Sequence, residues 1–240
     1  MWDKPPEELK LDVAYIDVWR TRIDLPEEEV KNYALTLSEE EQERAARFTF
    51  PGKYKEYVVS RGLLRRALAH VLKQPVTEFK FSYTESKKPY LSAKHLDQTL
   101  SFNISHSHGQ ALVAISLNRN IGIDIEKIRP DVEYEKLALR FFSTEEYKQL
   151  MLLPQDARAR SFFAIWTRKE AFVKAIGKGI AFGLSEFDVN INPEEPPLML
   201  ATRWNPKDAS LWSMATIDTE NDFIGTLATD GGEFQLRHWQ

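Results

Sequence analysis

The sequence predicts an α+β fold of two similar α/β halves that meet near residue 119, so that residues 1–119 and 120–240 form separate domains. Segments with the apolar spacing of helices alternate with short runs typical of strands. The second half repeats this theme less clearly, and no repeat in the sequence is strong enough to prove a duplication. The length of 240 residues is compatible with one domain or with two small ones.

The predicted first half begins with a strand at residues 13–19 and a helix opened by Pro26 and three glutamates, which the helix dipole favours. Ser38 and Glu41 form a capping box at the start of the next helix. Residues 54–72 have the apolar spacing of a long helix. Further strands are expected at residues 79–83, 90–91, 100–104 and 111–117.

A strand at residues 121–126 opens the predicted second half. Ser143 and Glu146 form a second capping box. A long helix is predicted over residues 157–176 and ends at Gly177, a common C-terminal signal. The remaining predicted elements are a helix around residues 137–142 and strands at residues 187–191, 211–215, 223–228 and 233–238.

The composition argues against several functional classes. A net charge of −4 argues against a dedicated nucleic-acid binder, which usually has a basic excess. The chain contains no cysteine, which excludes disulfides, thiolate metal sites and thiol nucleophiles. We see no signal peptide and no apolar run near the roughly 20 residues that span a bilayer. We therefore expect a soluble, cytoplasmic protein that binds neither nucleic acid nor membrane.

The strand at residues 121–126 carries the most informative side chains. Isoleucines alternate with Gly122, Asp124 and Glu126, so the isoleucines should face the core and the carboxylates the opposite side. Two neighbouring carboxylates repel each other, which indicates a cation between them. Gly122 has no side chain and would let a ligand approach closely.

The long helix of the second half supplies a third carboxylate. Glu170 and Lys174 are four residues apart and share one helix face. Glu170 can then reach a metal held by Asp124 and Glu126, while Lys174 points to the ligand of that metal. Three carboxylates and a lysine suit a magnesium ion with a phosphate-bearing substrate. The structural alternative is a solvated strand face and an ordinary helical ion pair worth a few tenths of a kcal/mol.

A turn predicted at residues 105–109 offers a second phosphate-binding element. It combines a hydroxyl, an imidazole and backbone N–H groups, which can bind phosphate oxygens. Either His106 or His108 could supply the imidazole, and the alternative is an ordinary surface turn. A scattered basic set in the first half would have to converge in part to bind a phosphate, and most of its members are expected on solvated helix faces. This set comprises Arg44, Arg47, Arg61, Arg65, Lys87 and Lys88.

These motifs resemble those of the 4′-phosphopantetheinyl transferases. The similar segments are residues 103–107, 121–126 and 166–174, with residues 141–147 in support. The length is that of the single-chain Sfp type rather than of the short trimeric holo-acyl-carrier-protein synthases, and the chain is also similar to cyanobacterial members. The resemblance extends from about residue 38 to residue 191.

The resemblance implies a fold of two pseudo-symmetric halves with the active site between them. Residues 1–119 would hold the adenine and 3′-phosphate of coenzyme A, and residues 120–240 the metal and the catalytic groups. The implied reaction is the magnesium-dependent transfer of 4′-phosphopantetheine from coenzyme A to a serine of an apo acyl or peptidyl carrier protein, with release of 3′,5′-ADP. A monomer is implied as well.

The implied roles in the second half follow the matched positions. Asp124, Glu126 and Glu170 would bind magnesium, and Glu170 would also be the general base. Lys174 would contact the phosphate being transferred, and Lys169 would assist nearby.

The implied coenzyme contacts lie mainly in the first half. Ser105 and His106 would hold coenzyme phosphates, Arg44 and Arg47 would bind the 3′-phosphate, and Lys88 matches a lysine beside the adenine. Arg61 and Arg65 are weaker candidates for the 3′-phosphate. Two residues depart from the family pattern, since Lys87 replaces a usual glycine and Glu41 stands where some relatives are basic.

Two alternatives remain open from the sequence. The three carboxylates also suit a magnesium-dependent nuclease or phosphatase, although the acidic balance argues against nucleic acid. The third possibility is a non-catalytic module that binds a carrier protein or coenzyme. The sequence does not identify the carrier, the breadth of specificity, the acceptance of acylated coenzyme A or the preference for magnesium over manganese.

Overall fold

The computed structural model describes residues 2–91, 99–179 and 182–240. The chain divides into two compact units, of which unit 1 comprises residues 1–83, 89–118 and 234–240, and unit 2 comprises residues 84–88 and 119–233. The predicted boundary lies where the chain passes from unit 1 to unit 2. Residues 84–88 and the C-terminal strand nevertheless join the other unit, for reasons given below. None of the described helices is both long and apolar enough to cross a membrane.

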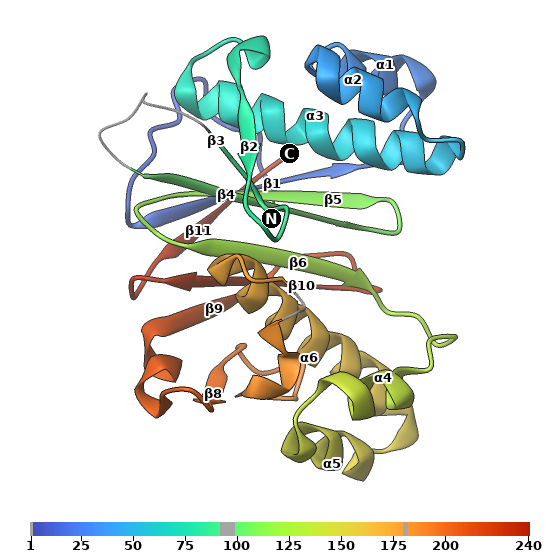
Figure 1. Ribbon diagram of the computed structural model, residues 1–240, viewed down its shortest axis with the longest axis vertical. Helices are drawn as coiled ribbons and strands as arrows, with labels where there is room; N and C mark the ends of the chain where they lie inside the picture. Colours follow the sequence, from blue (N-terminus) through green and yellow to red (C-terminus); the bar gives the residue numbers. More distant parts are fainter. Residues whose placement is uncertain (1, 92–98, 180–181) are drawn as a thin grey trace. The chain divides into compact units, whose positions relative to one another are not determined.

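Unit 1 is a four-stranded sheet with one long helix on it (Figure 1). The strand order is β11-β1-β5-β4, in which only the β11–β1 pair is parallel. Helix α3 packs on β1, β4 and β5, while α1 and α2 pack against α3. The bounds are β1 (Tyr15–Arg22), α1 (Glu27–Ala34), α2 (Glu39–Ala46), α3 (Pro51–Leu72), the 3₁₀ helix η1 (Val76–Glu78), the hairpin β2 (Phe81–Tyr83) and β3 (Pro89–Leu91), β4 (Leu100–Ser107), β5 (Gln110–Leu117) and β11 (Gln235–Trp239).

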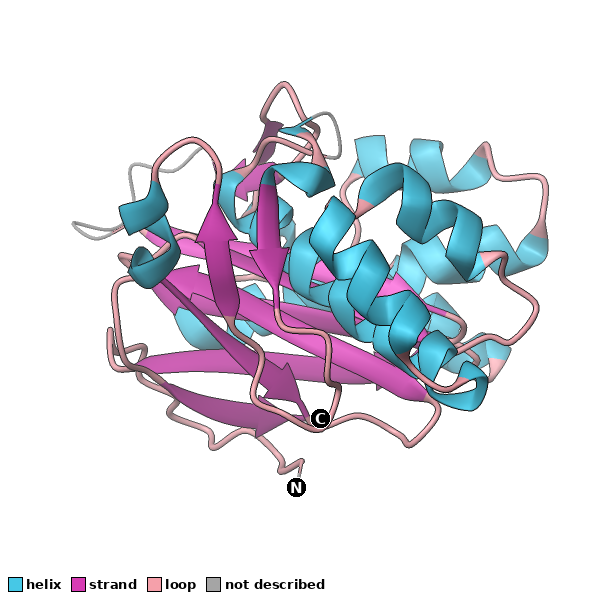
Figure 2. Cartoon of the chain, turned by 90° about the horizontal axis from the view of Figure 1, so that it is seen from below, coloured by secondary structure: helices cyan, strands magenta, loops and turns pink. Residues whose placement is uncertain are grey.

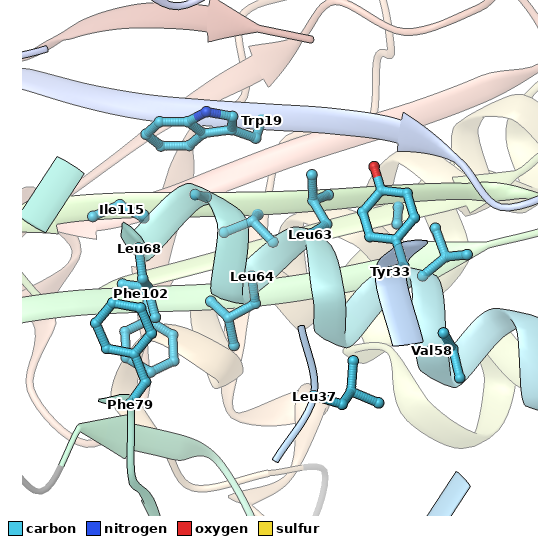
Figure 3. Packing of buried hydrophobic residues seen from close by; sticks show 14 of the residues in the cluster. Trp19, Tyr33, Leu37, Val58, Leu63, Leu64, Leu68, Phe79, Phe102 and Ile115 are labelled. Atoms are coloured by element: carbon cyan, nitrogen blue, oxygen red, sulfur yellow. The ribbon is translucent and has the colours of Figure 1, made fainter. Parts of the chain in front are cut away.

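The core of unit 1 lies between α3 and the sheet. Figure 3 shows Leu64 and Leu68 of α3 among Trp19 of β1, Phe102 of β4 and Ile115 of β5. All five side chains are buried. Burial of each such side chain contributes roughly 1.5–3 kcal/mol, so the apolar spacing of residues 54–72 determines which face of α3 meets the sheet.

Unit 2 has a three-stranded antiparallel sheet in the order β6-β10-β9. Helix α6 packs on β6 and β10, with α4 and α5 against α6. Figure 2 distinguishes its helices from its strands. The bounds are β6 (Ile121–Lys127), α4 (Tyr134–Phe141), α5 (Thr144–Leu152), α6 (Gln155–Ile176), η3 (Leu184–Glu186), the hairpin β7 (Phe187–Val189) and β8 (Met199–Thr202), η4 (Pro206–Leu211), β9 (Trp212–Ile217) and β10 (Phe223–Asp230).

The two units repeat one order of elements. Among the described residues, each has a strand, three helices, a 3₁₀ helix, a short hairpin and two long strands in that order, while unit 2 adds η4 before β9 and unit 1 adds β11. The sheet orders β1-β5-β4 and β6-β10-β9 correspond, and α3 and α6 both have 22 residues. The predicted α+β fold of two similar halves is confirmed.

A buried cation occupies the same place in both long helices. Arg65 and Lys169 each follow the first residue of their helix by 14 positions (51 to 65, 155 to 169). Arg65 Nε binds Glu41 Oε2 at 2.6 Å, and Lys169 Nζ binds Glu146 Oε2 at 2.8 Å. Both glutamates belong to the predicted capping boxes, which are present with Ser38 and with Ser143. The same acid therefore caps one helix and anchors the next.

The C-terminal strand joins unit 1 because Asp17 of β1 binds it. Arg237 donates from Nε to Asp17 Oδ1 at 2.7 Å and from Nη2 to Oδ2 at 2.6 Å, and Trp239 Nε1 donates to Oδ1 at 2.8 Å. Asp17 is completely buried. Three donors therefore balance a carboxylate that would be costly to bury alone.

Candidate active site

Strand β6 presents Asp124 and Glu126 on the face that α6 covers. Ile121, Ile123 and Ile125 are fully buried as predicted, but Gly122 and Asp124 are buried as well, so the prediction of a half-buried strand is wrong. Asp124 is only 4% exposed, and Glu126 is half-buried nearer the strand end. A carboxylate so deeply buried requires a cationic or donor partner.

Helix α6 supplies that partner. Lys174 Nζ donates to Asp124 Oδ1 at 2.6 Å and to the Ile123 carbonyl at 3.2 Å. Glu170 lies one turn earlier on the same helix face and is 9% exposed. The structure therefore brings the predicted strand carboxylates and the two helix residues together in unit 2.

The environment of Glu170 favours its neutral form. Burial is the main cause that raises the pKa of the Glu170 carboxyl to about 7; the Asp124 and Glu126 carboxylates act in the same direction, and Lys174 opposes them. Among the described residues, the buried Glu170 Oε1 has no hydrogen-bond partner. Leaving such an atom unsatisfied costs about 1–3 kcal/mol, so this oxygen is available to a ligand that supplies positive charge or a proton.

This set of donors fits a hard divalent cation. Magnesium is usually bound by one or two carboxylates together with substrate phosphates, and Asp124, Glu126 and Glu170 supply carboxylates here. The orphaned oxygen of Glu170 is the kind of atom that a cation would satisfy. Within the described ranges, no three acidic or histidine side chains are grouped tightly enough to hold an ion as they stand.

Gly122 serves packing between strand and helix. A Cβ at Gly122 would lie 2.0 Å from the Ala171 carbonyl oxygen and 2.4 Å from the Ala175 amide nitrogen. The prediction that its missing side chain leaves room for a ligand is wrong, because the α6 backbone fills that space. The close approach allows short side-chain contacts between α6 and β6.

Lys169 is not brought to this site. Its side chain is fully buried, and Nζ binds Glu146 and donates to the carbonyls of Leu184 at 2.7 Å and Phe187 at 2.5 Å. Burial lowers the pKa of this ammonium, and Glu146 opposes the shift. Lys169 directly precedes Glu170 in the sequence, but a step of one residue turns a helical side chain by about 100°. It occupies the anchoring place of Arg65 in unit 1.

Lys88 makes contacts different from those implied by the resemblance. Its Nζ donates to three backbone carbonyls of unit 2, those of Ile121 at 2.9 Å, Lys174 at 2.7 Å and Ala175 at 3.3 Å. Burial lowers the pKa of Lys88 to about 8, with a smaller opposing effect of Asp230. These contacts explain why residues 84–88 belong to unit 2 although β2 and β3 on either side belong to unit 1.

The backbone conformation of Lys87, which precedes Lys88, is one that favours glycine. Lys87 has a φ of 65°, in the left-handed region that favours glycine. The turn therefore keeps its left-handed backbone with a lysine in place of the usual glycine.

Ser105 and His106 lie on strand β4 rather than in a turn. They pair with Leu112 and Ala111 of β5, and β4 continues to Ser107. The turn consists of His108 and Gly109, with φ of 42° and 89°, which matches a two-residue hairpin of type I′. The predicted turn at residues 105–109 is therefore too long.

The exposure of the strand residues also differs. Ser105 is buried, whereas His106 is exposed with Nδ1 3.7 Å from Glu56 Oε1. His106 can thus meet a ligand from solvent.

A cavity of about 1330 Å³ in unit 1 collects the predicted phosphate-binding arginines. Arg44 and Arg47 line it together with Lys80, Tyr57 and Tyr83. The Arg44 guanidinium lies 5.3 Å from the centre of the Tyr57 ring. Tyr57 Oη is buried without a hydrogen-bond partner among the described residues. The lining also includes Glu39, Glu40 and Glu41, so its four basic side chains leave a small positive excess beside the aromatic walls, where Arg44 and Arg47 could meet an aromatic ligand that bears phosphate.

Arg61 and Arg65 serve the structure of this cavity. Arg61 Nε binds Glu41 Oε1 at 2.5 Å, Arg65 Nε binds Glu41 Oε2 at 2.6 Å, and Arg61 also donates to Tyr83 Oη. Burial raises the pKa of Glu41, but the two guanidiniums and the hydrogen bonds outweigh it and the pKa is lowered. Glu41 therefore engages both of the weaker candidates and offsets one of their two positive charges.

Arg168 has a role that the sequence does not indicate. It is buried on α6 and donates to the carbonyls of Asn190 at 2.5 Å, Asn192 at 2.9 Å and Glu195 at 3.0 Å. Burial lowers its pKa to about 10, which Glu195 opposes. Every residue has a backbone carbonyl, so the sequence does not indicate which carbonyls Arg168 binds. These hydrogen bonds hold the loop before β8 against α6.

Two family descriptions match the chain. The family 4′-phosphopantetheinyl transferase, N-terminal, matches residues 25–118, and the 4′-phosphopantetheinyl transferase superfamily matches residues 120–228. Apart from residues 84–88, the first match lies in unit 1, and the second contains Asp124, Glu126, Glu170 and Lys174.

Individual proteins are similar over most of the chain. The identity is 36% over 238 residues to 4′-phosphopantetheinyl transferase HetI of Nostoc sp. strain PCC 7120, which covers 99% of this chain and 97% of that protein. It is 32% over 170 residues to 4′-phosphopantetheinyl transferase gsp of Aneurinibacillus migulanus, with coverages of 71% and 68%. It is 31% over 170 residues to 4′-phosphopantetheinyl transferase Sfp of Bacillus subtilis strain 168, with coverages of 71% and 73%.

Proposed function

This chain belongs to the 4′-phosphopantetheinyl transferases and transfers the 4′-phosphopantetheine group of coenzyme A to carrier proteins, and we propose that Glu170, Lys174, Asp124 and Glu126 of unit 2 carry the reaction. Family membership removes the alternatives of a nuclease, a phosphatase and a non-catalytic binding module.

One observation supports this assignment above the others. Glu170 is a buried carboxyl with an unpartnered oxygen and a pKa raised to about 7, and Asp124 and Lys174 lie beside it. A general base works best when its pKa is near the operating pH. The ionised carboxylate, which a bound cation would favour, would accept the proton of the acceptor hydroxyl through its unpartnered oxygen.

The proposed reaction assigns each group one task. The acceptor serine oxygen forms a bond to the β-phosphorus of coenzyme A, Glu170 takes the serine proton, and the bond to the bridging oxygen breaks to release 3′,5′-ADP. Lys174 offsets negative charge on the phosphate being transferred. Positioning and electrostatic stabilisation dominate phosphoryl transfer, so small changes in these distances should affect the rate strongly.

A magnesium ion is part of the proposal. Asp124, Glu126 and Glu170 would hold it, and it would supply positive charge to the pyrophosphate of coenzyme A. A carboxylate has two oxygens, so one oxygen of Glu170 can bind the ion while the other accepts a proton. Lys169 is left out of the catalytic set because its ammonium is engaged by Glu146 and two carbonyls.

On the coenzyme side we propose Arg44 and Arg47 as ligands of the 3′-phosphate. The support is the cavity of unit 1 that both residues line. His106 is retained as a contact for a coenzyme phosphate because it is exposed, whereas Ser105 is buried and is the weaker candidate for such a contact. Lys88 is treated separately below.

We also propose a monomer that works in the cytoplasm on an acyl or peptidyl carrier. The absence of cysteine is compatible with a reducing compartment. Sedimentation of the purified protein and fractionation of its host would test these two points.

The decisive experiment replaces the proposed base. Purified Glu170→Gln is incubated with magnesium, coenzyme A and an apo carrier protein, and the gain of a phosphopantetheine arm is followed by mass spectrometry. We expect the rate to fall by about 10²- to 10⁴-fold, the usual contribution of a general base.

The matched control is Asp156→Asn, which removes an exposed carboxylate from the first turn of the same helix. It should retain the wild-type rate. Modification by Glu170→Gln at a rate close to wild type would remove Glu170 from the mechanism.

A further inference from the structure

Lys88 forms a bridge between the helix and the strand that carry the proposed catalytic residues. Its Nζ contacts Ile121 O at the first residue of β6, and Lys174 O and Ala175 O in the last turn of α6. Ile121 is three residues before Asp124 on the strand. Lys174 contributes its carbonyl to Lys88 and its own ammonium to Asp124.

The helix end explains why an ammonium is held there. The last four carbonyls of a helix have no partner within the helix, and those of Lys174 and Ala175 are among them because α6 ends at Ile176. A cation at this end is also favoured by the helix dipole. Ser86 adds a second contact from the same loop, since its hydroxyl donates to the Gly177 carbonyl at 2.5 Å.

The hydrogen-bonding capacity of Lys88 is fully used by these contacts. A lysine ammonium has three N–H donors and no acceptor. Three carbonyl oxygens lie within 3.3 Å of Nζ. A direct contact with coenzyme A would require one of these bonds to break. The contacts therefore indicate an internal role for Lys88 rather than the implied role beside the adenine.

The position of the bridge gives it influence on the active site. The α6 backbone already meets β6 at Gly122, where the structure has no space for a side chain. Lys88 binds directly beside this contact: on the strand at Ile121, the residue before Gly122, and on the helix at Lys174 and Ala175, whose backbone Gly122 itself meets. The two contacts together fix the end of α6 against β6.

We propose that Lys88 is a positioning residue for phosphopantetheine transfer, which holds the Glu170–Lys174 end of α6 in register with Asp124 on β6. The inference rests on the roles proposed for these three residues. It predicts that loss of the ammonium lowers kcat and leaves the KM for coenzyme A unchanged. A ligand of the coenzyme would instead raise KM.

The test compares Lys88→Met with Lys87→Met, which removes the adjacent, exposed lysine of the same loop. Both are assayed with magnesium, coenzyme A and an apo carrier at a temperature below the unfolding transition of each. For Lys88→Met we expect kcat to fall between ~10-fold and ~100-fold, the range produced by a misplacement of about 1 Å. KM for coenzyme A should stay within about twofold, and Lys87→Met should match wild type.

Chemical rescue separates the ammonium from the rest of the side chain. The chain has no cysteine, so Lys88→Cys introduces a single thiol. Alkylation with 2-bromoethylamine rebuilds an ammonium at nearly the original length, whereas iodoacetamide adds a neutral group. We expect the first product to regain most of kcat and the second to remain as slow as Lys88→Met.

A second variant covers the case in which Lys88→Met does not fold. Ser86→Ala removes the milder contact with the same helix end, and it should lower kcat several-fold without changing KM. A rise in KM for coenzyme A with unchanged kcat in the Lys88 variants would overturn the proposal, as would wild-type kinetics. The two proposals fail in different experiments. An active Glu170→Gln variant would contradict the proposed function, whereas the kinetics of the Lys88 variants test the positioning role.

Discussion

Replacement of Glu170 by glutamine should stabilise the fold while it removes activity. The carboxyl is buried beside Asp124 and Glu126, and its Oε1 has no hydrogen-bond partner among the described residues. Ionised Glu170 is therefore a source of instability in the native state. Glutamine has nearly the same shape and carries no charge, so Glu170→Gln removes the cost of ionisation.

The magnitude follows from the shift in pKa. Burial is the largest cause that raises the pKa of Glu170 from 4.5 to about 7. Each pKa unit corresponds to about 1.4 kcal/mol, which gives about 3 kcal/mol when both the native and the unfolded protein are ionised. Because the side chain is only 9% exposed, solvent screening reduces this value little.

The sign depends on pH. Between the two pKa values the native protein holds the proton and the unfolded chain has lost it, so the stability of the wild type falls as pH rises from 4.5 through about 7. Glu170→Gln lacks this slope. We expect the free energy of unfolding of the variant to exceed that of the wild type by about 1 kcal/mol at about pH 5 and by about 3 kcal/mol at about pH 8.

Urea unfolding followed by circular dichroism measures this difference. The buffer should contain a chelator, because a bound cation would stabilise the ionised carboxylate and hide the effect. Other titrating groups are common to both proteins and cancel in the comparison. A difference that is independent of pH, or a wild type that is the more stable protein at about pH 8, would refute the account of Glu170.

Two further substitutions test the packing beneath the site. Gly122→Ala should destabilise unit 2 by roughly 3 kcal/mol or more and abolish transfer, because its Cβ would overlap Ala171 O, whereas Gly52→Ala, in open space, should be neutral or stabilising in thermal unfolding. Lys169→Met should lower the free energy of unfolding by about 3–5 kcal/mol, because it leaves the buried Glu146 without its cationic partner, but KM and kcat of the folded protein should stay near wild type. A large loss of kcat in a fully folded variant would show that Lys169 is catalytic.

The sequence predicts the elements of the site better than it predicts their contacts. The alternation in residues 121–126 and the spacing of Glu170 and Lys174 depend on the periods of strand and helix, which are properties of the local chain. Both capping boxes are equally local. These features can therefore be predicted.

Contacts with the backbone of distant segments cannot be predicted in the same way. Lys88 and Arg168 both donate to carbonyls, and every residue has a carbonyl, so no partner stands out in the sequence. At Gly122 the sequence shows a missing side chain without showing what fills the space, which favours the wrong assignment to a ligand. Strand β8 (Met199–Thr202) escapes prediction because it is short and follows a proline-rich loop.

The equivalent positions of Arg65 and Lys169 in the two halves can be recognised in the sequence. Each lies 14 residues into a helix and pairs with the last residue of a capping box, Glu41 or Glu146. Comparison of the two halves at these positions identifies Lys169 as an anchor. The family motif places it next to Glu170 and so favours a catalytic role.

The return of β11 (Gln235–Trp239) to unit 1 limits how the gene for this enzyme can be divided. A fragment that stops at residue 119 would keep Asp17 in the sheet without Arg237 and Trp239, and would leave the edge of β1 open to association with other chains. Each unit depends on residues from the opposite half of the chain. A split enzyme should therefore carry residues 234–240 with its first fragment.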